Sequence, residues 1–93
     1  GASARLRQTE TEAHAAFQRL SKVAKAIFKN DPGKLKSLGL QGTMPKRIAE
    51  FIGAAYTLFD NAMNVPELRD ELARYGYNDR KLEAEKQKIV DYD

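Results

Sequence analysis

The sequence predicts an all-α domain resembling a four-helix bundle, with two long helices, shorter C-terminal helices and one additional short helical segment. Two long stretches carry apolar residues in steps of three, four and seven, as one face of a helix requires. No stretch shows the alternating, β-branched pattern of a strand. A segment that begins with proline and ends with glycine occurs twice, each time between two longer helical stretches. These three observations favour helices throughout the chain.

The first long helix is expected over residues 4–30. Its apolar residues cover an arc of about 140°, and a row of lysines lies opposite. One face of this helix is therefore expected to be buried and the other to be wet and basic. The helix should stop near Asn30, because Pro32 disfavours helix in the residue before it and Gly33 favours a turn.

A short helical segment over 34–40 is expected next, ended by Gly39. The second long helix is expected over 44–63, with Thr43 as its N-cap. Its apolar arc is wider, about 160°, which indicates a central position in the fold. Gly53 lies outside that arc, and we expect it to allow the close approach of a neighbour.

The third helix is expected over 65–75. Asn64 and Glu67 resemble a capping box at its start. Gly76 should end the helix, with Tyr77 folding back over the last turn.

Asn78 is expected to cap a fourth helix, which starts at residue 79 and reaches the last residue without a stop signal. The chain has the length of one helical domain, residues 1–93. The missing stop signal is also the pattern of a piece of a longer chain. The expected core is formed by Phe17, Leu20, Val23, Ile27, Leu38, Ile48, Phe51, Ile52, Phe59, Leu68 and Leu72.

The two proline-to-glycine segments, Pro32 to Gly39 and Pro66 to Gly76, allow two interpretations. One is an internal duplication, because helical repeats recur at comparable spacing. The other is the chance recurrence of helix start and stop signals. In both interpretations the prolines and glycines are signals of local structure and carry no chemistry.

The second half of the chain contains Phe59-Asp60-Asn61-Ala62, then Pro66-Glu67-Leu68, and then Leu72-Ala73-Arg74-Tyr75-Gly76-Tyr77. Together with the turn at 38–42, this segment resembles small uncharacterised bacterial helical-bundle proteins. The resemblance covers about residues 35–93. It implies a helical bundle that belongs to a longer chain, and it implies no activity.

Composition excludes several classes of protein. With no cysteine, the chain cannot form disulfides or thiolate metal sites. No apolar run reaches the ~18 residues of a membrane span, and no signal peptide is visible in residues 1–93. The location is unknown from the sequence, and cytoplasmic is only the default. Residues 1–47 contain ten Lys or Arg and three acids, whereas residues 48–93 contain six and ten. This asymmetry indicates either a basic face for a partner or attraction between the two halves of the fold.

Residues for catalysis or metal binding are scarce. His14 is the one histidine, and Glu10, one turn earlier, points the same way. A single such pair does not supply the three or four ligands of a metal site, so we interpret it as a surface pair. The other carboxylates of residues 67–91 alternate with Lys and Arg, as on solvated helix faces. We therefore expect no enzyme, no cofactor and no metal.

Two surfaces are candidates for binding. Arg19, Lys22, Lys25 and Lys29 form a basic face that can contact phosphates without sequence preference, although it lacks aromatic residues for stacking on bases. The tyrosines Tyr75, Tyr77 and Tyr92 form a candidate interface, because tyrosine is favoured where a ring packs and its hydroxyl stays wet. The alternative is that these tyrosines cover the rim of the core.

The leading expectation is a non-enzymatic helical interaction module that binds a protein partner or self-associates. The alternative is weak, sequence-independent nucleic-acid binding through the basic face of the first helix.

Overall fold

The computed structural model describes residues 2–42 and 47–93, with side chains from residue 4 onward. These residues form five helices and no strand, which confirms the all-α class. The helices are α1 (Ala2–Ile27), α2 (Pro32–Ser37), α3 (Ile48–Asn64), α4 (Pro66–Arg74) and α5 (Asp79–Tyr92).

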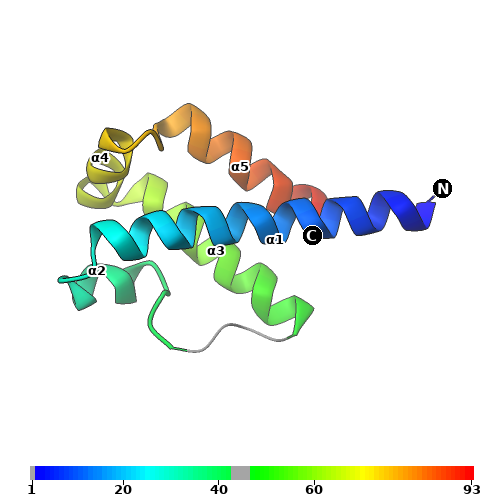
Figure 1. Cartoon of the computed structure of the whole chain (residues 1–93), viewed down its shortest axis with the longest axis horizontal. Coiled ribbons are helices and arrows are strands. Elements are labelled where there is room, and N and C mark those ends of the chain that lie inside the picture. Colours follow the sequence, from blue (N-terminus) through cyan, green and yellow to red (C-terminus); the bar gives the residue numbers. More distant parts are fainter. Residues whose placement is uncertain (1, 43–46) are drawn as a thin grey trace.

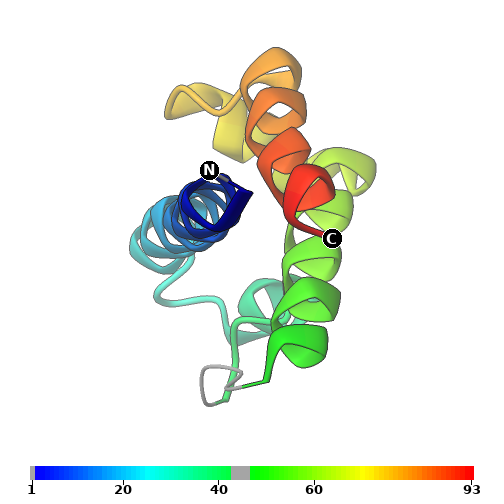
Figure 2. The ribbon, with the colours of Figure 1, turned by 90° about the vertical axis from the view of Figure 1, so that its right-hand side faces the viewer.

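The last helix links the two long helices. α5 packs against both α1 and α3, and α4 packs against α3 (Figures 1 and 2). α1 and α3 run in the same general direction, whereas α5 runs against them. The chain therefore does not alternate up and down through its long helices, as the simplest bundle would. The first turns of α1 extend past all other helices (Figure 1).

Both proline-to-glycine segments end in the same backbone motif. After α2, the Leu40 N–H donates to the Leu35 carbonyl at 2.8 Å, and Gly39 has a φ of 73°. After α4, the Tyr77 N–H donates to the Leu72 carbonyl at 3.0 Å, and Gly76 has a φ of 94°. A bond over six residues closed by a left-handed glycine is the Schellman motif. The prolines and glycines of both segments are thus confirmed as local start and stop signals, which fits both interpretations of their recurrence.

Helix starts agree with expectation in one case and differ in another. The Asn78 side chain accepts a hydrogen bond from the Lys81 N–H at 2.9 Å and caps α5, as predicted. The capping box at Asn64 was wrong: Asn64 is the last residue of α3, and the N-cap of α4 is Val65, which makes no side-chain bond. The cap predicted at Thr43 lies outside the described residues.

Asp31 caps α2, a role that was not predicted from the sequence. Its carboxylate accepts from the Lys34 N–H at 3.2 Å, so α2 starts directly after it, at Pro32. α1 ends at Ile27, three residues before the expected stop.

The core is continuous, and every helix except α2 supplies fully buried residues to it; Leu35 of α2 packs against it half-buried, and Leu38 follows just after α2. Alanines on α1 and α3 let these helices approach their neighbours closely. Ten of the eleven expected core residues are buried or packed against the core. Ile48 is the exception. It is 61% exposed because α3 starts at this residue, so it lies at the open end of the helix. The buried hydrophobic residues are Ala13, Ala16, Phe17, Leu20, Ala24, Phe28, Leu38, Phe51, Ala55, Leu58, Phe59, Ala62, Leu68, Leu72, Tyr77, Leu82 and Ile89.

Gly53 does not serve close packing, contrary to expectation. A Cβ built at this position meets no atom within 4 Å outside its own helix turn, and the residue is exposed. The glycine therefore weakens α3 without a packing gain that the described residues reveal.

Substituting these glycines should have opposite effects. Gly53→Ala should raise the free energy of unfolding by about 0.5–1 kcal/mol, because alanine favours helix and restricts the unfolded chain. Gly76→Ala should lower it by about 1 kcal/mol, because the left-handed backbone there strains any Cβ. Urea unfolding of both variants measures the difference. A loss of stability in Gly53→Ala would mean that a neighbour occupies the space beside α3.

Candidate functional site

A buried carboxylate joins the first and last helices. Leu82, Glu85 and Ile89 share one face of α5 by their spacing of three and four, and this face packs on α1. Leu82 and Ile89 are fully buried, and Glu85 between them is only 2% exposed. The prediction that the carboxylates of residues 67–91 all lie on solvated faces is therefore wrong for Glu85.

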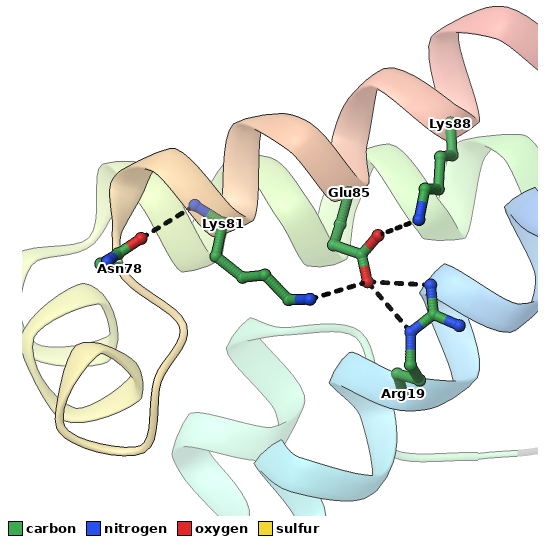
Figure 3. Close-up of polar contacts among 5 residues, drawn as sticks. All are labelled: Arg19, Asn78, Lys81, Glu85 and Lys88. Atoms are coloured by element: carbon green, nitrogen blue, oxygen red, sulfur yellow. Dashed lines mark hydrogen bonds and ion pairs between the residues drawn. The ribbon is translucent and has the colours of Figure 1, made fainter.

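Three cations surround Glu85 (Figure 3). Arg19 of α1 donates a hydrogen bond from Nε to Oε1 at 3.0 Å, and its Nη2 forms an ion pair with the same oxygen at 2.9 Å. Lys88 Nζ lies 2.7 Å from Oε2, and Lys81 Nζ lies 3.7 Å from Oε1. Each cation is between 37% and 48% exposed, so the charged ends reach the carboxylate from the solvent side. The carboxylate is the buried member of the cluster, and its partners are half solvated.

The electrostatics keep Glu85 ionised. Burial by itself raises the pKa of the carboxyl, but the hydrogen bonds and charges of Lys88 and Arg19 outweigh burial and hold the pKa below its ordinary value. A carboxylate that stays charged and accepts from several donors is poorly suited to general acid catalysis near neutral pH. The arrangement is suited to fixing α5 against α1.

The predicted basic face is divided by this cluster. Arg19 is engaged with Glu85, so it does not act as a free cation. Lys22, Lys25 and Lys29 are exposed and form no ion pair with any described residue. Beside them, a shallow depression of about 320 Å³ is lined by Gln18, Ser21, Lys22 and Lys25. The Ser21 hydroxyl is buried there and has no hydrogen-bond partner among the described residues.

The three predicted interface tyrosines are not brought together. Tyr75 is 60% exposed after α4, whereas Tyr77 is 6% exposed and belongs to the core. Tyr92 is half-buried at the far end of α5, about 20 Å along the helix from its start. Burial raises the pKa of the Tyr77 hydroxyl, and the Glu85 charge adds to the effect. Only Tyr75 offers most of its ring to a partner.

His14 packs against aromatic rings. Its imidazole stacks on Phe51 of α3, with ring centroids 3.9 Å apart and planes 18° apart, and Tyr92 lies 6.1 Å away. No ion pair joins His14 to Glu10 among the described residues, so the expected surface pair is replaced by a stack. In the described ranges, no three His, Asp or Glu side chains come together as metal ligands.

A second ion pair links α5 to α3. Lys86 Nζ lies 2.6 Å from the Asp60 carboxylate and over the Tyr56 ring, and the Tyr56 hydroxyl donates to Asp93 at 2.9 Å. A groove of about 380 Å³ runs beside this pair, lined by Met63, Glu83, Lys86, Gln87 and Val90. These polar contacts fix α5 against α3, as the Glu85 cluster fixes it against α1.

No protein-family model, curated protein or solved structure matches this chain. The resemblance to bacterial helical-bundle proteins therefore stays a prediction. No helix within residues 2–42 and 47–93 combines the length and the apolar character of a membrane span.

Glu85→Gln should lower the free energy of unfolding by about 1–3 kcal/mol, because it leaves three cations facing a neutral, buried amide. Glu83→Gln is the matched control: Glu83 is two residues away, exposed and without an ion pair among the described residues, so it should change stability by less than about 0.5 kcal/mol. Thermal and urea unfolding of the two variants provide the comparison. Equal effects would contradict a structural role for Glu85.

Stability should fall in acid, partly through Glu85. Because the folded pKa lies below the ordinary value of 4.5, the contribution is complete above about pH 4.5 and is lost as pH falls through the folded pKa. Urea unfolding between pH 7 and pH 2 should therefore show a smaller pH dependence in Glu85→Gln than in the wild type. Identical pH dependence in the two proteins would show that Glu85 titrates normally.

Proposed function

We propose that this chain is a non-enzymatic helical interaction module that can self-associate. Within this proposal α1, α3, α4 and α5 are the four helices of a bundle-like module, and α2 is the additional short segment. The observation that carries the proposal is the unpartnered start of α1. Its first turns extend past the other helices, and Leu6 there is 60% exposed (Figure 1).

The non-enzymatic part of the proposal is supported by the contacts of Glu85 and His14, the two side chains best suited to proton transfer, because both are engaged in contacts between helices. Glu85 is held ionised by Arg19 and Lys88, and the His14 ring is stacked on Phe51. Both side chains contribute to packing between helices. Neither has a neighbouring nucleophile within the described contacts.

A specific observation also favours the second candidate, weak nucleic-acid binding. Lys22 and Lys25 are exposed on α1, and Lys29 follows in the turn after the helix; none of the three has an acidic partner among the described residues. Three lysines contact phosphates and release counterions, so such binding would weaken steeply with salt. The engagement of Arg19 with Glu85 leaves this face without its arginine.

Sedimentation equilibrium separates the two candidates. For the interaction module, the mass of the chain alone should rise with protein concentration and should not change when generic duplex DNA is added. A mass increase on addition of DNA would favour nucleic-acid binding instead, if it disappears at high salt and is smaller in Lys25→Glu. A monomer in every condition would contradict both.

A further inference from the structure

The start of α1 extends past the other described helices and is mostly exposed (Figure 1). α1 is 26 residues long, and every side chain from residue 4 to 12 is exposed except Thr9, which is half-buried. From Ala13 onward one face of the helix is buried. An isolated helical stretch of two to three turns is marginal in water, so a neighbour would stabilise it.

The buried face of α1 continues into this free stretch. Ala13, Ala16 and Leu20 follow steps of three and four, and the same steps lead backward to Thr9 and Leu6. This is the spacing of the inner positions of a coiled coil. Leu6 and Thr9 therefore extend the seam of α1 beyond the point where α3 and α5 cover it.

Charged residues flank this seam in a self-complementary way. Arg5 directly precedes Leu6, and Glu12 directly precedes Ala13, so the two occupy the same position one heptad apart. When two identical helices pack antiparallel about a twofold axis, equivalent flanks face each other. Arg5 then faces Glu12 of the second copy, Glu12 faces its Arg5, and each Leu6 lies opposite a Thr9.

The rest of the fold selects the antiparallel orientation. α3 and α5 pack on the seam side of α1, and Ala13 there is already fully buried. A second helix running parallel along the seam would meet these helices after residue 12. An antiparallel second helix leads its own domain away from them, in the direction of the N-terminal turns of α1.

We propose that residues 5–12 of α1 are a self-association site that binds the same segment of a second copy, antiparallel, through Leu6 and the reciprocal pair Arg5–Glu12. This site rests on the proposed function, and its partner is a second copy of the same chain. Two to three turns per copy bury less than the roughly 1,200 Å² of a standard interface, so the affinity falls in the range of about 10 μM to 1 mM.

Charge exchange in the full chain tests the site. Sedimentation equilibrium up to about 1 mM protein at low salt gives the dimer dissociation constant. Arg5→Glu and Glu12→Arg should each weaken association ~5–30-fold, because each turns two attractive pairs into repulsive ones. The double variant should restore wild-type association. A parallel pair would not be restored, because Arg5 would then face Glu10.

Arg7→Glu is the matched control. It makes the same charge change two residues away on the outer face of α1, so it should leave association unchanged. The three substituted positions, Arg5, Arg7 and Glu12, are exposed, and circular dichroism checks that each of the four variants folds. If the wild type associates but Arg5→Glu has no effect, or the double variant is not restored, this site is wrong while the interaction module stands. A wild-type monomer at every concentration would overturn both.

Discussion

The contact between α1 and α5 is the constraint on which the other helices depend. α5 is the last helix of the chain and packs on both α1 and α3, which contact each other less extensively (Figure 2). The apolar side chains Leu82 and Ile89 supply the burial, and Glu85 between them supplies polar contacts to α1. This contact joins the first helix of the chain to the last. The position of α1 relative to α3 therefore depends largely on α5, which packs against both.

A carboxylate in the middle of this contact makes the packing specific. Taking a charge out of water is costly, and only well-placed cations offset the cost. Arg19 is one such cation, and it reaches Glu85 only when α1 lies at one position along α5. A shift of α5 by one turn would leave the carboxylate buried without it. We infer that Glu85 restricts the register of the two helices more than it adds to their affinity.

The same contact decides which surfaces remain for partners. It engages Arg19 and so reduces the basic face of α1 to lysines. The tyrosines lie at opposite ends of α5: Tyr77 is buried just before its first residue, and Tyr92 is its last residue. The first part of α1 extends beyond the contact with α5, and none of the described helices covers its inner face there (Figure 1). The proposals for function therefore rest on what α5 leaves uncovered.

Local features of the fold could be predicted from the sequence because they depend on neighbouring residues. The φ angle that Gly39 and Gly76 adopt, the cap at Asn78 and the helical spacing of the leucines are all decided within a few positions of the chain. The cap predicted at Asn64 was wrong because α3 continues through this residue, and local signals do not decide to which of two adjacent helices a residue between them belongs.

The sequence alone therefore determined the all-α class, the order of the helices and most of the core. Only the tertiary structure decided that Glu85 is buried, that Ile48 is exposed and that His14 is stacked. The signal for Glu85 was its position between Leu82 and Ile89, but its required partner, Arg19, lies 66 residues away. Helical periodicity reports which face of a helix a residue occupies. Which helix covers that face, and where the cover ends, depends on contacts between distant segments that no local pattern records.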